Sequence, residues 1–235
     1  MKKGLTELVF ILDRSGSMAG LESDTIGGFN GMLKKQRQVE GEAIVTTVLF
    51  DDRYELLHDR IRLDGVPALT GEEYYVRGCT ALLDAVGQTI RKIIGVQKNT
   101  AEAHRAEKVI FVITTDGLEN ASREYSYEQV RNLIKEEQEK YGWEFLFLGA
   151  NMDAVSEGDR LGIRAERSVT FECSSAGLAD NYRAVSCFLE KARCQKAPMG
   201  AEWKKPIEEG RRRREKQGRH ETNTQGNKLA KRRAY

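Results

Sequence analysis

Cysteine, histidine and proline are scarce in this 235-residue chain, which holds four, three and three of them respectively. No two cysteines have the C-x-x-C spacing of a zinc or redox motif, and three histidines are too few to complete a zinc set. A chain of this length builds its core without disulfides. We therefore expect four reduced thiols, at Cys79, Cys173, Cys187 and Cys194.

Long hydrophobic runs are also missing near the start of the chain. The apolar run Leu8–Leu12 ends at Asp13, which makes it too short for the core of a secretion signal or for a membrane span. We therefore expect a soluble, cytoplasmic protein with no membrane span.

Positive charge is unevenly distributed. Residues 203–235 hold 12 Lys and Arg against 4 Asp and Glu, whereas residues 1–202 hold 26 against 32. Helical periodicity also stops near Pro198, which predicts a folded domain over 1–197 and a basic, disordered tail over 198–235. The tail could contact polyanions through Arg211, Arg212, Arg213 and Arg214, remain solvated, or dock on an acidic partner or on the acidic body itself.

Apolar runs alternate with helical patterns along the body, which predicts an α/β fold with a mostly parallel sheet and helices on both faces. The hairpin Ala43–Leu57 adds one antiparallel strand at an edge. The expected helices are Leu21–Gln38, Cys79–Gln97, Tyr125–Lys140, Asp153–Leu161 and Ala176–Lys196. The expected strands are Glu7–Leu12, Ala43–Phe50, Arg53–Leu57, Lys108–Thr115, Trp143–Gly149 and Ser168–Phe171.

Oxygen-bearing side chains follow two of the buried strands and precede one helix. Asp13, Ser15 and Ser17 come directly after the first strand. Thr80 opens the helix Cys79–Gln97, and Asp116 ends the strand Lys108–Thr115. Functional residues of such sheets gather at the carboxyl ends of the strands, so we expect these five to converge. Asp51, Asp52, Glu119 and Asn151 also follow strands, but turn or solvated roles are favoured for them.

The converging set suits a hard divalent cation. Three hydroxyls and two carboxylates supply the oxygen ligands that Mg²⁺ prefers, and the absence of His and Cys argues against zinc or copper. If neither carboxylate binds directly, the ion stays electrophilic and accepts a carboxylate from a partner protein.

This pattern resembles the metal-ion-dependent adhesion site (MIDAS) of the von Willebrand factor type A (vWA) family, over roughly residues 5–196. Cys79 departs from the pattern, since the family usually has glycine before the threonine. Further phrases are similar to bacterial intracellular members: Gly28-Phe29-Asn30, Cys79–Ala85 and Phe147–Asn151.

The resemblance implies a six-stranded, doubly wound, Rossmann-like sheet. It also implies Mg²⁺ or Mn²⁺ coordinated directly by Ser15, Ser17 and usually Thr80, with Asp13 and Asp116 often acting through water. The remaining coordination position would accept an acidic side chain of another protein.

Two catalytic interpretations compete with binding. Gly16–Gly20 misses the G-x-S-x-G elbow of serine hydrolases by one position, and no G-x-x-x-x-G-K-[ST] phosphate loop occurs. Mg²⁺-dependent phosphoryl transfer by Asp13 remains the alternative, but the general acid expected two residues on is replaced by Ser15. We therefore expect a protein-binding module and no enzyme.

Overall fold

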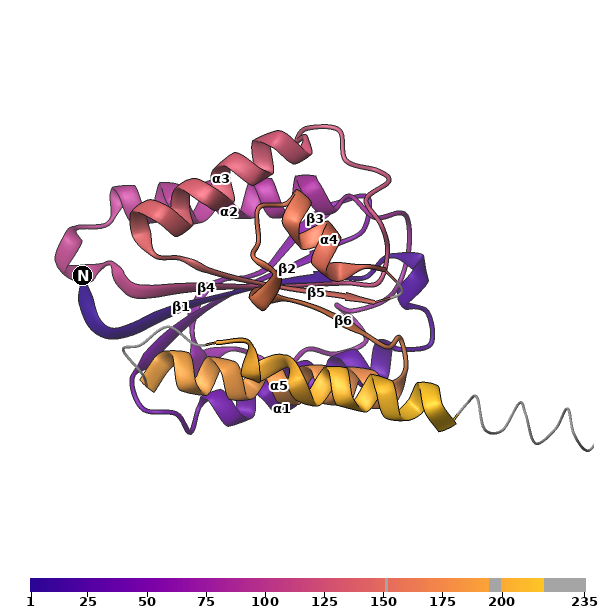
Figure 1. Ribbon diagram of the computed structural model, residues 1–235. Coiled ribbons are helices and arrows are strands. Elements are labelled where there is room, and N and C mark those ends of the chain that lie inside the picture. The colour runs from indigo at the N-terminus through magenta and orange to yellow at the C-terminus, as the bar shows by residue number, and fades with distance from the viewer. Residues whose placement is uncertain (151, 195–199, 218–235) are drawn as a thin grey trace, which may run out of the picture.

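The computed structural model describes residues 1–150, 152–194 and 200–217. Its centre is a six-stranded sheet in the order β3-β2-β1-β4-β5-β6 (Figure 1). All neighbours are parallel except β2 and β3, which form the antiparallel hairpin at one edge. The predicted fold is confirmed. The strands are β1 (Lys2–Asp13), β2 (Glu42–Phe50), β3 (Tyr54–Arg62), β4 (Ala106–Thr115), β5 (Glu144–Ala150) and β6 (Ser168–Phe171).

Helices cover both faces of the sheet. One layer holds α1 and α5, and the other holds α2, α3 and α4 (Figure 1). The α-helices are α1 (Glu22–Gln36), α2 (Leu82–Asn99), α3 (Tyr127–Tyr141), α4 (Ala154–Arg160) and α5 (Ser175–Cys194). Short 3-10 turns are η1 (Gly16–Met18), η2 (Leu63–Gly65), η3 (Glu102–His104), η4 (Ala165–Arg167) and η5 (Ala201–Lys204).

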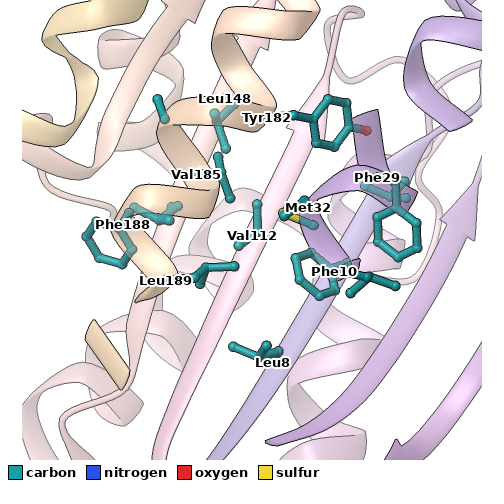
Figure 2. Packing of buried hydrophobic residues seen from close by; sticks show 14 of the residues in the cluster. Leu8, Phe10, Phe29, Met32, Val112, Leu148, Tyr182, Val185, Phe188 and Leu189 are labelled. Carbon is teal, nitrogen blue, oxygen red and sulfur yellow. The ribbon is translucent and has the colours of Figure 1, made fainter. Parts of the chain in front are cut away.

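Each central strand contributes side chains to two cores because successive residues point to opposite faces. On β1, Leu8 and Phe10 face α1 and α5, as Figure 2 shows, while Val9 and Ile11 belong to the core under α2 and α3. This two-sided burial explains why the strand is continuously apolar rather than alternating.

The glycine-rich helix α1 packs closely against α5. A Cβ atom on Gly28 would lie 2.1 Å from the ring of Tyr182, so only glycine allows the two helices this approach. Gly27 and Gly31 face open space, and the structure offers no physical account of them.

The predicted domain boundary at residue 197 is too early. Trp203 and Ile207 are buried in the core formed by α1 and α5, and residues 205–217 are helical. Arg214 pairs with Glu172 and Asp180, so this basic segment docks on acidic groups of the body. The remainder of the predicted tail, residues 198–199 and 218–235, lies outside the described residues.

Within the described part of the chain, no helix is both long enough and apolar enough to cross a membrane.

Candidate metal centre

Three of the predicted site residues lie in the turn that leaves β1. Ser15 donates its backbone N–H to Asp13 Oδ1 at 2.7 Å, which turns the chain back over the end of the strand. The hydroxyl oxygens of Ser15 and Ser17 lie 3.0 Å apart. One short loop therefore presents a carboxylate and two hydroxyls together.

Asp116 joins this group from β4, the strand beside β1. The pairing of Leu12 with Thr114 brings the ends of the two strands to the same level. Ser17 then donates its hydroxyl to Asp116 Oδ1 at 2.5 Å, across 99 residues of sequence. The sheet register therefore brings together the two predicted carboxylates.

Thr80 reaches the same place from a loop and not from a helix. The helix α2 begins at Leu82, so the expectation that Thr80 opens it is wrong by two residues. Thr80 exchanges two hydrogen bonds with Asn120: its N–H donates to Oδ1 at 2.9 Å, and its carbonyl accepts from the Asn120 N–H at 3.1 Å. These contacts hold Thr80 in the loop ahead of the helix.

The turn after Asp116 requires glycine. A Cβ atom on Gly117 would lie 2.7 Å from Thr80 Oγ1 and 3.3 Å from Ser17 Oγ. Both hydroxyls therefore approach the Asp116–Gly117 backbone. The structure thus places all five predicted residues at one spot on the carboxyl edge of the sheet.

The two carboxylates are buried, and no basic side chain of the described residues pairs with them. Asp13 is 2% exposed and Asp116 is 5% exposed. Burial raises the pKa of Asp13 to about 6, although hydrogen bonds from Thr115 and Ser15 act to lower it. Burial also raises the pKa of Asp116, against hydrogen bonds from Ser17 and Cys173. Among the described residues, no Lys, Arg or His forms an ion pair with either carboxylate.

This donor set fits a hard divalent cation. Two buried carboxylates of uncompensated charge are costly unless a positive charge joins them. Hydroxyl and carboxylate oxygens are ligands of Mg²⁺ and Mn²⁺, whereas zinc sites usually use His and Cys. No cluster of three or more His, Cys, Asp or Glu side chains suited to a metal occurs within residues 1–150, 152–194 and 200–217. The hydroxyl-rich set is therefore the candidate metal site within the described residues.

Sequence reasoning missed the groups that orient Asp13. The Thr115 hydroxyl donates to Asp13 Oδ2 at 2.6 Å. The buried Tyr74 donates its hydroxyl to the Asp13 carbonyl at 2.6 Å. Thr115 could have been inferred, since the last residue of β4 must lie beside the last residue of β1. Tyr74 lies in a long loop whose path has no sequence signal.

Asp51 has the predicted turn role, since its Oδ1 accepts from the Arg53 N–H at 2.8 Å, but it is fully buried and not solvated, and the sequence did not reveal its further contacts. Its carboxylate accepts from Arg14 Nε at 3.0 Å and from Arg77 Nε at 2.6 Å. Its backbone carbonyl accepts from the Ala81 N–H at 2.8 Å. Burial would raise the pKa of Asp51, but hydrogen bonds from Arg77, the Arg53 N–H and Arg14 hold it below its ordinary value.

Asp51 therefore ties together the two loops that carry the hydroxyls. Arg14 sits between Asp13 and Ser15, and Arg77 leads into Thr80. Arg14 is itself fully buried, and its remaining nitrogens donate to Glu55 at 2.6 Å and to the Glu73 carbonyl at 3.2 Å.

The other polar residues that follow strands, and the two cysteines near the site, have different roles. Asp52 is exposed, as expected. Glu119 accepts from the Leu83 N–H at 2.9 Å near the start of α2, and also from the backbone of its own loop, so it is structural. Asn151 lies outside the described residues. Cys79 is exposed beside Thr80, and the Cys173 thiol donates to Asp116 Oδ2 at 3.7 Å.

No protein-family model and no curated protein matches the sequence. Solved structures do match. Proximal thread matrix protein 1 from the mussel byssus, described with a zinc-occupied MIDAS motif, has a TM-score of 0.56 at 17% identity. That alignment covers 80% of this chain and 46% of the mussel protein, so the chain spans about half the length of that neighbour.

Two bacterial proteins also have structures similar to this chain. A von Willebrand factor type A protein from Catenulispora acidiphila gives a TM-score of 0.52 at 16% identity, covering 79% of this chain and 42% of that one. The vWF domain of the type V pilus tip protein Mfa5 from Porphyromonas gingivalis gives a TM-score of 0.54 at 10% identity. That alignment covers 83% of this chain and 97% of the Mfa5 domain. The protein therefore has the vWA fold.

Proposed function

We propose that this protein is a divalent-metal-dependent protein-binding module. Mg²⁺, or Mn²⁺, would be held by Asp13, Ser15, Ser17, Thr80 and Asp116, and it would accept an acidic side chain from a partner protein. The observation that carries this proposal is a pair of buried carboxylates that no basic side chain of the described residues pairs with, beside three hydroxyls from two loops.

The chain's own residues prepare the site for such an ion. Ser15 N–H and the Thr115 hydroxyl each occupy one oxygen of Asp13, which fixes the carboxylate without neutralising it. This arrangement favours the water-mediated role that the family resemblance implies for Asp13. When bound, the cation supplies an electrophilic position that a carboxylate can fill.

The structural neighbours support a metal at this position. The mussel byssus protein has the same fold and carries zinc in its MIDAS motif. For this chain we favour Mg²⁺ or Mn²⁺ because the proposed ligands are all oxygens.

The surface around the site suits a protein partner. Leu118 and Tyr75 are 59% and 42% exposed, and both lie in loops next to site residues. Beside Thr80 a groove of about 700 Å³ runs between the β2–β3 turn, the start of α2 and residues 120–124. Exposed apolar side chains around a polar anchor are typical of interaction surfaces.

Catalysis by Asp13 has less support. Both of its oxygens accept hydrogen bonds from the protein, and Ser15 stands where phosphotransferases of this type carry an acid. His58 is buried against Thr47 and does not reach the site. We therefore favour a module without enzymatic activity.

Polyanion binding by the arginine run also has less support. Arg214 is engaged with Glu172 and Asp180, and Arg211 lies 3.5 Å from Glu215. This leaves Arg212 and Arg213 as the exposed arginines of the run. Two exposed arginines on one helix give a weak site compared with the 6–10 phosphate contacts of typical nucleic-acid binders.

Calorimetric titration of Mg²⁺ into the wild-type protein and Asp13→Ala tests the proposal. The wild type should bind one ion and Asp13→Ala none. Asp52→Ala, which removes an exposed acid from the same edge, is the matched control and should bind normally. Equal binding by wild type and Asp13→Ala would overturn the metal assignment.

The protein-binding half of the proposal needs a second measurement. Immobilised protein should retain an acidic partner in Mg²⁺ and release it in EDTA, and Ser17→Ala should retain much less. Metal-dependent phosphate-ester hydrolysis that is lost in Asp13→Asn would favour the catalytic alternative instead.

A further inference from the structure

The C-terminal helix, residues 205–217, runs along the edge strand β6 toward the side of the sheet that holds the proposed metal site. Just before this helix, Lys204 Nζ donates to the carbonyl of Ser168, the first residue of β6. Near its end, Arg214 pairs with Glu172, the residue that follows β6. Figure 1 shows the helix reaching beyond the sheet on the side where β1 ends. The last turns of the helix therefore lie at the carboxyl edge of the sheet.

Close contacts hold the end of this helix in place. Arg214 donates to Asp180 Oδ2 on α5 at 2.9 Å, in addition to its pairing with Glu172. A Cβ atom on Gly210 would lie 2.3 Å from the same Asp180 oxygen, so glycine is needed for the carboxylate to come this close. The helix end is therefore docked on the body at a defined position.

The gap between the helix end and the proposed metal site is short. Cys173 directly follows Glu172, the partner of Arg214, and its thiol donates to Asp116 Oδ2 at 3.7 Å. The strand β6 is two strands from β4, which leads into Asp116. With strands about 4.8 Å apart, roughly 10–20 Å separate the helix end from the proposed metal. About three to six residues of extended polypeptide span such a gap.

Positive charge is concentrated in this part of the helix. Residues 211–217 hold four Arg and one Lys against a single Glu. Two of the arginines pair with carboxylates, Arg211 with Glu215 at 3.5 Å and Arg214 with the body. Within the part of the chain that the structure describes, no ion pair is formed by the other three cations, which are exposed and which we call the basic face: Arg212, Arg213 and Lys216.

The basic face points away from the body. Spacings of three and four residues place Arg213 and Arg212 on the same side of the helix as Lys216. Ile207 and Arg214, seven residues apart, lie on the side that contacts the body. Like charges four residues apart, such as Arg212 and Lys216, destabilise a helix. Acidic groups of a bound partner would remove that repulsion.

We infer that the partner protein of the proposed metal site is acidic over a wider surface, and that the basic face is its second contact. One carboxylate of the partner would bind the metal, and neighbouring carboxylates would pair with Arg212, Arg213 and Lys216. This inference rests on the proposed function, because the metal supplies the first contact. Two weak contacts joined in one partner bind more tightly than either alone, since the second forms at a high effective concentration.

An acidic polypeptide suits this surface better than a nucleic acid does. The helix 205–217 contains no aromatic residue that could stack on bases. Three cations are also few compared with the roughly 6–10 phosphate contacts of typical DNA-binding proteins. Carboxylates along an extended polypeptide, by contrast, can reach both the metal and the basic face.

An oligo-aspartate peptide of about ten residues is a suitable probe, because its extended length of about 33 Å spans both contacts. Its affinity for the full-length protein is measured calorimetrically, in Mg²⁺ and in EDTA. The wild type should bind the peptide about tenfold more tightly, or better, in Mg²⁺ than in EDTA, because EDTA removes one of the two contacts.

Two charge-matched variants test the position of the second contact. One removes the basic face: Arg212→Gln, Arg213→Gln and Lys216→Gln. The other removes exposed lysines at the C-terminal ends of α1 and α5, on the opposite edge: Lys34→Gln, Lys35→Gln and Lys191→Gln. All six positions are exposed, so both variants should keep the wild-type melting temperature.

In Mg²⁺, the basic-face variant should bind the peptide about tenfold more weakly than the wild type. The opposite-edge variant should bind like the wild type, because its substitutions lie beyond the reach of a partner at the metal. Added salt should reduce the difference between the wild type and the basic-face variant, since exposed ion pairs are screened.

No binding of the peptide by the wild type, or equal affinity of the wild type and the basic-face variant, would overturn this inference. The titration of Mg²⁺ into Asp13→Ala decides the metal site separately. An equal loss in the opposite-edge variant would also overturn the inference, because net charge and not position would then govern binding.

Two further outcomes would assign the basic face differently. Binding that EDTA leaves unchanged but that the basic-face variant loses would overturn the proposed function together with this inference. Tighter binding of a single-stranded DNA oligonucleotide than of the peptide would overturn the acidic partner and favour a nucleic acid.

Discussion

Single residues decide the electrostatics of the candidate metal centre, and Asp13 is an example. Its carboxylate lies 2% exposed at the end of β1, held by Ser15 and Thr115. In the unfolded chain the same group would have its ordinary pKa, 3.8, against about 6 in the folded protein. Without metal, the folded protein therefore holds this proton more tightly than the unfolded chain does.

The sign of the pH dependence follows. Protonated Asp13 contributes to the free energy of unfolding. This contribution is fully present below about pH 4 and is lost as the pH rises through about 6. The total loss is at most about 3 kcal/mol. In EDTA at pH 7.5, Asp13→Asn should therefore be more stable than the wild type by about 1–3 kcal/mol. At pH 4 the two should be nearly equal. Urea unfolding at both pH values measures this, and equal stability at pH 7.5 would contradict it.

Asp51 should be essential for a different reason. Asp51→Asn leaves the fully buried Arg14 without its buried carboxylate partner, which should cost about 3–5 kcal/mol. Because Asp51 also holds the loop of Thr80, Mg²⁺ affinity should fall as well. Glu55→Gln is the control: its carboxylate also pairs with Arg14 but is 43% exposed, so the cost should be below about 1 kcal/mol. Urea unfolding and calorimetry together check both effects.

At the scale of elements, apolar periodicity predicted the six strands and the helices α1 to α5, because each buries one or two complete faces, but it missed the helix at residues 205–217. Where the start or end of an element differs from the prediction, contacts with distant parts of the chain or exposure at the sheet edge explain the difference. The start of α2 is delayed because Thr80 bonds to Asn120 and Ala81 donates to the Asp51 carbonyl. The edge strand β3 extends to Arg62, beyond the predicted Leu57, because polar residues can continue an exposed edge.

The segment after α5 was misread for a related reason. Basic residues dominate its composition, with twelve Lys and Arg in residues 203–235. Two apolar residues four apart, Trp203 and Ile207, are a weak signal of a buried face. Their partners are side chains of the distant core, and sequence periodicity does not reveal such partners. Trp203 packs edge-on against Phe188, with ring centroids 5.6 Å apart.

We therefore expect Trp203→Ala to lower the free energy of unfolding by about 3–5 kcal/mol, because it empties a buried aromatic position. A chain that ends at residue 199 should lose at least as much. Arg212→Ala, an exposed change in the same segment, should stay within about 0.5 kcal/mol of the wild type. Thermal and urea unfolding measure all three. An unchanged melting temperature in the shortened chain would restore the domain boundary at residue 197.

At the scale of the whole molecule, the proposed site exists only in the complete fold. Its residues come from three segments, after β1, before α2 and after β4. Sheet register brings the first and the last together, and the contacts of Thr80 with Asn120 and of Ala81 with Asp51 bring in the second. That convergence could be predicted, because parallel strands share a carboxyl edge. Tyr74 and the Asp51 network could not, because they depend on the path of residues 63–81.

A ligand that binds only the folded state stabilises it by mass action. At a free Mg²⁺ concentration about 100 times its dissociation constant, the free energy of unfolding should rise by about 2.7 kcal/mol. Thermal unfolding across a series of Mg²⁺ concentrations measures the effect. The melting temperature of Ser17→Ala should respond much less, and a response equal to that of the wild type would point to a metal bound elsewhere.

The C-terminal segment also closes one edge of the sheet. Trp203 Nε1 donates to the Glu166 carbonyl at 2.9 Å, and Lys204 Nζ donates to the carbonyls of Ala165 and Ser168 at 2.7 and 3.0 Å. These groups lie along and just before β6, the last strand of the sheet. Uncovered edge strands are templates for pairing with other chains. Proteolytic loss of this segment would therefore uncover an edge strand that other chains can pair with, and aggregation would follow from a cut far from the candidate metal site.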